Sequence, residues 1–152
     1  MTRTIYAPSR KSMHLSMYVF CMFFVTLLVS SCTPKIFQDA QSLSNFSNLK
    51  NQATSLLSKA TGNYSDHASD VEALTKSMND QISYEKSRGE KNNKTVQMLQ
   101  LLMDPASNLL GGVLNRWKSE GKLGQGFVNE ATKLVGNNFD KIINLEKAKP
   151  AQ

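Results

Sequence analysis

The strongest constraint on the fold is the spacing of the apolar residues, which recur every three or four positions through most of the chain after residue 35. That interval matches the helical repeat of 3.6 residues and gives each segment one apolar face. The alternation of apolar and polar residues that is typical of strands does not occur there, and β-branched residues are sparse. The pattern therefore predicts an all-α domain over residues 36–147, a small four- to five-helix bundle.

The same pattern and the residues that interrupt it predict five helical segments, at 36–60, 66–88, 96–103, 106–117 and 127–145. Glycine is the usual residue just beyond a helix, so we expect the first, second and fourth segments to end at Gly62, Gly89 and Gly121. Asp104-Pro105 has the composition of a helix start, and Gly136 is expected to interrupt the last segment. Residues 148–152 are predicted to be a frayed tail. The narrow apolar stripe of segment 36–60 leaves open whether it packs on the bundle.

Gly111 and Gly112 stand inside a predicted helix. Each such glycine costs about 1 kcal/mol relative to alanine, so the pair indicates a kink or the close approach of another backbone. We favour packing over a ligand contact at this point. Trp117 continues the apolar line of the same segment and is expected in the core rather than in a ligand-stacking pair with Arg116.

The first 31 residues differ in kind from the rest. They contain no acidic residue, their three basic residues lie within the first 12, and residues 13–29 are largely apolar. This order is typical of a secretory signal peptide. The uninterrupted apolar run covers residues 17–29 and is shorter than the roughly 20 residues of a permanent membrane span. We therefore predict that residues 1–31 are removed and that the remaining chain is exported.

The junction Val29-Ser30-Ser31-Cys32 resembles the lipobox of bacterial lipoproteins. The resemblance implies cleavage between Ser31 and Cys32, and attachment of diacylglycerol and an N-acyl chain such as palmitate to Cys32. The cysteine content agrees with this assignment. Cys21 lies in the removed segment, so an unmodified Cys32 would be the one remaining reactive thiol in an oxidising compartment, and lipidation removes that thiol. The alternative is that Cys32 is an incidental thiol after a signal peptide or a membrane helix.

Residues 32–35 form the predicted lipidated tether, which spans about 14 Å when extended. A folded domain on so short a tether must lie against its membrane. Thr33 replaces the Asp that favours inner-membrane retention in enterobacterial lipoproteins, so the resemblance implies the outer membrane, facing the periplasm. Lys35 is placed to contact anionic head groups.

Charge argues against nucleic-acid binding. The formal net charge is +6, but residues 32–152 carry 15 Lys and Arg against 12 Asp and Glu, and the two signs are interleaved. No basic stripe of the kind that tracks a phosphate backbone is present in the sequence. We therefore expect no nucleic-acid partner.

Catalytic motifs are missing from the sequence. His67 is the only histidine after the signal region, and no G-x-S-x-G, H-E-x-x-H or C-x-x-C pattern occurs. Asp66, His67 and Asp70 have the spacing of a weak metal site, although acids at a helix start are more simply explained by the helix dipole. Gly124-Gln125-Gly126 is better interpreted as a helix connection than as a phosphate loop. We predict no catalytic residue, metal ligand or cofactor.

These observations favour a non-enzymatic helical interaction module, anchored to the membrane through Cys32 and binding a protein partner of the cell envelope. One alternative is a carrier of a lipid or apolar small molecule, with residues 99–103, 109–114 and Phe127 lining a cavity. A less favoured alternative is an envelope hydrolase with an unrecognised site.

Overall fold

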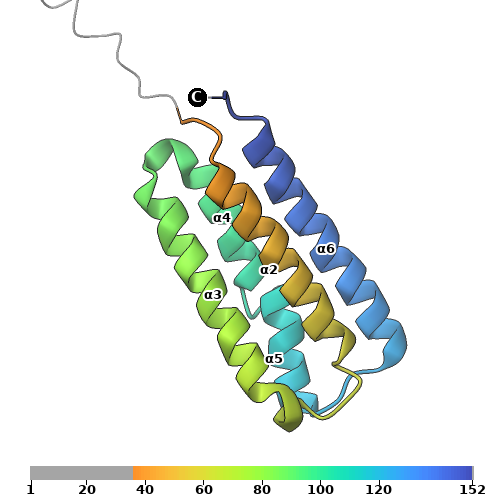
Figure 1. Ribbon diagram of the computed structural model, residues 1–152. Helices are drawn as coiled ribbons and strands as arrows, with labels where there is room; N and C mark the ends of the chain where they lie inside the picture. The colour runs from red at the N-terminus through yellow and green to blue at the C-terminus, as the bar shows by residue number, and fades with distance from the viewer. Residues whose placement is uncertain (1–35, 152) are drawn as a thin grey trace, which may run out of the picture. The chain divides into compact units, whose positions relative to one another are not determined.

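The computed structural model describes residues 36–151, and within that range it contains helices and no strand (Figure 1). The α-helices are α2 (Ala40–Ser58), α3 (Ala68–Ser87), α4 (Asn93–Met103), α5 (Leu110–Glu120) and α6 (Gln125–Lys147). Two short 3-10 helices, η1 (Tyr64–His67) and η2 (Glu90–Asn92), precede α3 and α4. The predicted all-α bundle is confirmed.

Three long helices and one broken column make up the bundle. Helices α2, α3 and α6 run along its length, while α4 and α5 follow one another along the remaining side (Figure 1). Helix α2 packs on both α6 and α3, with the larger contact on α6. The first helical segment is therefore an integral part of the bundle. The lead-in segment, residues 36–39, lies at the same end as the C-terminus, and we call this the lead-in end.

The apolar faces meet in one continuous core. Its largest fully buried side chains include Trp117, as predicted, together with Phe46 and Phe139. Five of the residues named above as possible cavity walls are also buried in this core: Leu99, Leu102, Leu110, Val113 and Leu114. Leu101 and Phe127 instead lie at the surface.

Several predicted boundaries are corrected by side-chain capping. The first helix begins at Ala40 rather than residue 36, because Asp39 is its N-cap and accepts a hydrogen bond from the Gln41 amide at 2.8 Å. Asp104 follows α4 instead of starting α5. Its Oδ1 accepts from the Ala106 amide at 2.9 Å, which favours a turn, and α5 begins only at Leu110.

Some glycines end helices, and others lie where two segments pack closely together. Gly89 and Gly121 have positive φ angles of 98° and 76° and end α3 and α5 as predicted. The first helix ends at Ser58, before Gly62. Gly136 does not interrupt α6, which continues to Lys147. A Cβ at Gly136 would lie 3.7 Å from Lys50 and Thr54 of α2, so this buried glycine lies where the two helices approach.

The Gly111-Gly112 pair marks a close backbone approach, as expected, although it lies in the first turn of α5 rather than inside a helix. A Cβ on Gly111 would lie 2.1 Å from the Met103 carbonyl oxygen, and one on Gly112 would lie 1.6 Å from the Ser107 carbonyl oxygen. The connection between α4 and α5 therefore folds directly against the start of α5. Only glycine leaves room for it.

The tail also differs from expectation. Residues 148–152 were predicted to be frayed, yet the Pro150 carbonyl oxygen accepts a hydrogen bond from the Gln38 amide at 2.8 Å. The Lys149 side chain is only 10% exposed. The tail is therefore bonded to the lead-in segment, and both segments lie at the same end of the bundle.

We expect Gly112→Ala to lower the free energy of unfolding by about 1–3 kcal/mol, because the new methyl group overlaps the Ser107 carbonyl group. Gly126→Ala is the matched control. No atom lies within 4 Å of a Cβ there, so a change of a few tenths of a kcal/mol or a small gain is expected. Urea unfolding followed by circular dichroism measures both. Equal effects of the two substitutions would contradict the close approach.

Candidate functional site

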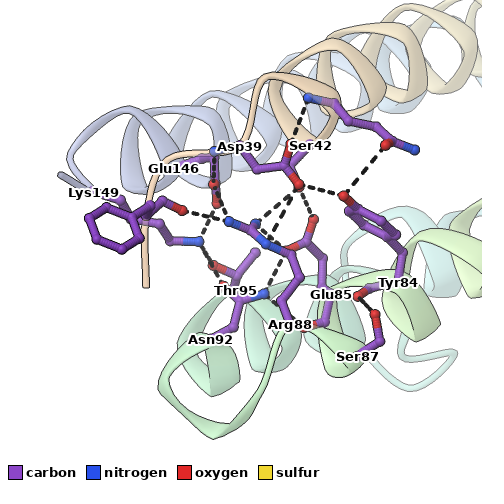
Figure 2. Close-up of polar contacts among 12 residues, drawn as sticks. Asp39, Ser42, Tyr84, Glu85, Ser87, Arg88, Asn92, Thr95, Glu146 and Lys149 are labelled. Atoms are coloured by element: carbon purple, nitrogen blue, oxygen red, sulfur yellow. Dashed lines mark hydrogen bonds and ion pairs between the residues drawn. The ribbon is translucent and has the colours of Figure 1, made fainter. Parts of the chain in front are cut away.

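A cluster of polar side chains lies at the lead-in end, where the lead-in segment, four helices and the tail converge (Figure 2). We call it the polar junction. It comprises Asp39, Ser42, Tyr84, Glu85, Arg88, Asn92, Thr95, Glu146 and Lys149. These residues come from segments far apart in sequence, so the junction exists only when the bundle is folded.

Arg88 lies at the centre of the junction. Its guanidinium nitrogens lie 2.9 Å from Glu85 Oε2 and 3.0 Å from Glu146 Oε1, and the side chains of both glutamates are 0% exposed. A buried carboxylate is very costly without a partner, so each glutamate depends on this arginine. The same guanidinium donates to the Phe37 carbonyl oxygen at 2.7 Å and thereby holds the lead-in segment.

The remaining lone pairs of Glu85 are also satisfied. Its Oε1 accepts from Ser42 Oγ at 2.5 Å and from Gln81 Nε2 at 2.7 Å. Its Oε2 accepts from Asn92 Nδ2 at 2.5 Å as well as from Arg88. The buried carboxylate therefore connects α2, α3 and η2.

Glu146 is satisfied from the two ends of the described chain. Its Oε1 accepts from the Asp39 amide at 2.9 Å, and its Oε2 pairs with Lys149. Lys149 also donates to Asn92 Oδ1 at 2.7 Å. This glutamate thus joins the lead-in segment to the tail through α6.

Asp39 and Tyr84 form the outer edge of the junction, where the Tyr84 hydroxyl donates to Asp39 Oδ2 at 2.5 Å. Burial raises the pKa of Asp39, but the hydrogen bonds from Tyr84 and Gln41 and the positive charge of Arg88 outweigh it and lower that pKa overall. The pKa of Tyr84 is raised by the hydrogen bond to Asp39 and by burial. Burial lowers the pKa of Arg88, yet its bonds to Glu146 and Glu85 raise it overall, so the guanidinium stays charged.

The junction is chemically closed. Across residues 36–151, the only buried side-chain polar atom without a hydrogen-bond partner is Thr132 Oγ1, which is not part of the junction. A carboxylate that is fully occupied by donors has no lone pair directed at a substrate. The arrangement is suited to fixing the lead-in segment against the bundle, since a fully satisfied polar network holds its members in one geometry.

The predicted lipid-attachment residue, Cys32, and the predicted cleavage site between Ser31 and Cys32 lie outside the described residues, as does the tether. His67 and Asp70 do approach, with Nδ1 3.5 Å from Oδ2, but Asp66 instead accepts hydrogen bonds from Asn63 and Ser65. The described part of the chain holds no group of three or more His, Cys, Asp or Glu residues that could bind a metal ion.

The other candidates have structural roles. Trp117 Nε1 donates to the Gly62 carbonyl oxygen at 3.0 Å, and the Trp117 ring packs against Tyr64 and His67. The Arg116 guanidinium lies 4.4 Å from the centre of the Phe127 ring and not on Trp117. Gly124 is the N-cap residue of α6 and ends the connection that precedes it, whereas Gly126 lies in the first turn of α6.

Two surface hollows of about 400 and 460 Å³ lie between α2 and α3. The first is lined mainly by amide and hydroxyl side chains, among them Gln41, Asn45, Gln52, Ser77 and Tyr84. Both differ from the predicted carrier cavity, whose apolar residues belong to α4, α5 and α6.

The sequence patterns above did not predict the polar junction, although the sequence contains one signal for it. Glu85 continues the apolar line of α3 from Met78 and Ile82, and Glu146 continues that of α6 from Phe139 and Ile142. A charged residue at a core position indicates a buried ion pair. Its partners could not be read in the same way, because they come from other segments.

No protein-family model, curated protein or solved structure matches this chain. Within the described residues, none of the helices combines the length and the apolar character needed to cross a membrane. The proposed function therefore rests on the motifs of this sequence and on the side-chain contacts of the described residues.

We expect Arg88→Ala to lower the free energy of unfolding by about 3–5 kcal/mol, because it leaves the buried Glu85 carboxylate without a cation and leaves Glu146 with Lys149 alone. The matched control is Lys76→Ala, which removes an exposed ion pair with Asp80 and should cost about 0.3–0.5 kcal/mol. Denaturant titrations compare the two. A loss below about 1 kcal/mol for Arg88→Ala would show that the junction does not depend on this charge.

The lowered pKa of Asp39 predicts an acid-side loss of stability. A carboxyl group whose pKa is lower in the folded state stabilises the fold above its unfolded value, near 3.8, and this contribution disappears as the pH falls through the folded value. Asp39→Asn should therefore flatten the dependence of unfolding free energy on pH below about pH 5. Asp104→Asn serves as the control. An unchanged slope in the Asp39 variant would contradict the assignment.

Proposed function

We propose that the protein is a lipoprotein of the bacterial cell envelope, anchored through acylated Cys32 and acting as a non-enzymatic helical interaction module close to the membrane. The resemblance of Val29-Ser30-Ser31-Cys32 to a lipobox supports the anchor. The observation that carries the proposal is the polar junction, which fixes the chain to the bundle only a few residues after that cysteine.

The lead-in segment is held at successive backbone atoms. Arg88 holds the Phe37 carbonyl, Pro150 holds the Gln38 amide and Glu146 holds the Asp39 amide. A free loop would not need three such bonds. The chain is thus bonded to the bundle from Phe37 onward, and the predicted tether of residues 32–35, about 14 Å when extended, allows the domain little freedom to move away from the membrane.

An interaction role agrees with the use of the buried charges. In the junction, Glu85 and Glu146 are paired with Arg88 and Lys149. This pairing makes the junction rigid, and it leaves neither of these two carboxylates free for acid–base chemistry. A rigid bundle on a short tether presents its sides to proteins that lie in the plane of the same membrane. By the lipoprotein resemblance, Thr33 places that membrane as the outer membrane, with the domain facing the periplasm.

The test of the anchor is Cys32→Ala in the full-length chain. We expect the variant to lose incorporation of labelled palmitate and to accumulate uncleaved precursor, because both acylation and cleavage require the thiol. Cys21→Ala is the matched control and should keep the label. Labelling and mass are read by gel and mass spectrometry. Continued labelling of the Cys32 variant would overturn the anchor.

The interaction role is tested in the same strains by in-cell crosslinking followed by mass spectrometry. A defined envelope protein should be crosslinked to the native chain and lost in the Cys32 variant. If the native chain is acylated but yields no specific adduct, the anchor stands and the interaction role fails.

A further inference from the structure

Four exposed lysines gather at the lead-in end, around the polar junction. Lys86 lies in the last turn of α3, Lys91 in η2, Lys94 in the first turn of α4 and Lys147 at the end of α6. These elements meet at the end where the lead-in segment joins the bundle (Figure 1). None of the four forms an ion pair with another described residue.

The acids at this end are mostly unavailable to balance them. Glu85 and Glu146 are fully buried and paired with Arg88 and Lys149, and Asp39 is bonded within the junction. Outside the junction, Glu90 is the exposed acid of this end that forms no ion pair with a described residue, whereas Asp80 and Asp140, farther along α3 and α6, pair with Lys76 and Lys50. The outer surface therefore presents four positive charges against one negative charge.

The opposite end has a different balance. Its cations Lys59, Arg116, Lys118, Lys122 and Lys133 face as many acids: Asp66, Asp70, Glu72, Glu120 and Glu130. Two of these cations form ion pairs, Lys59 with Asp70 and Arg116 with Glu120. The excess of positive charge is thus a property of the lead-in end and not of the whole bundle.

Phe37 adds an apolar contact to the same end. Its carbonyl group is fixed by Arg88, yet its side chain remains 38% exposed. Aromatic side chains and lysines together are favoured at the boundary between lipid and water, where the ring enters the head-group layer and the ammonium groups meet phosphates.

We propose that the lead-in end docks on a surface of anionic phospholipid, with Lys86, Lys91, Lys94 and Lys147 facing the phosphates and Phe37 entering the head-group layer. The orientation relies on the proposed function, because the short tether at residue 32 directs this end toward the membrane. Each lysine near such a surface favours the docked state by about fivefold. The anchor limits the distance between the domain and the membrane, and the lysines determine which end of the bundle faces the lipid.

The experiment uses the acylated protein, processed at Cys32, in vesicles of phosphatidylcholine, alone or with phosphatidylglycerol. Amine acetylation is measured for each lysine by peptide mass spectrometry. On the anionic vesicles we expect labelling of the four lysines to fall about threefold relative to neutral vesicles, while Lys118, Lys122 and Lys133 remain unchanged. Raising the salt to 1 M, where the screening length is only about 3 Å, should abolish the protection.

A charge variant tests the cause in a second way. Phe37→Trp provides a fluorescent probe whose emission should shift to shorter wavelength on anionic vesicles. Replacing all four lysines with glutamine should remove that shift. Replacing Lys59, Lys118, Lys122 and Lys133, which are exposed toward the opposite end, makes the same change in net charge and should preserve it. Circular dichroism verifies that both variants fold.

Equal protection on neutral and anionic vesicles, or loss of the shift in both charge variants, would overturn the docking proposal. The two proposals fail separately. Missing acylation at Cys32 overturns the anchor, whereas an acylated protein whose four lysines stay reactive on anionic vesicles overturns only the docking surface. Protection by an added acidic protein instead of by the vesicles would assign the patch to a protein partner and also overturn it.

Discussion

The ion pairs of Arg88 with Glu85 and Glu146 are the interaction on which the rest of the lead-in end depends. One planar guanidinium reaches both carboxylates at these core positions, and Lys149 adds a second cation at Glu146. The other members of the junction then complete the hydrogen bonding that this buried charge demands. As a result, α3, α6 and the lead-in segment share one fixed geometry.

The broken column of α4 and α5 is the second constraint. A continuous helix there would run from the lead-in end to the opposite end, but the turn at Asp104 ends α4 and folds against Gly111 and Gly112. The break leaves each half free to pack its own apolar face, with Leu99 and Leu102 in one half and Trp117 in the other. Close approach at two glycines thus permits one bundle to be built from unequal helices.

The sequence was sufficient for the fold class because helical period depends on local spacing, and the positions of Gly89 and Gly121 followed from their backbone freedom. Boundaries set by side-chain bonds were harder to predict. Asp104 looked like a helix start because Asp-Pro commonly serves there, whereas its carboxylate bonds a turn amide. Gly136 looked like a break, but α6 continues through it where that helix packs on α2.

The polar junction could not be predicted in the same way, because its partners are separated by as many as 107 residues. The sequence shows that Glu85 and Glu146 occupy core positions, and no more. Which cation meets them depends on how α3 and α6 are brought together, and the fully buried Glu146 also needs the Asp39 amide. Long-range polar pairing is a property of the assembled bundle, so local patterns carry little information about it.

A buried polar junction contributes little net stability, since well-packed apolar residues often stabilise a fold as much as a buried ion pair does, or more. Its distinguishing property is direction. Apolar contacts constrain the position of a segment but not the orientation of its peptide groups, whereas Arg88 and Glu146 select the carbonyl of Phe37 and the amide of Asp39. In the proposed lipoprotein, with its anchor at Cys32, that selectivity would determine how the bundle is aligned on its anchor. The junction is therefore better explained by orientation than by stability.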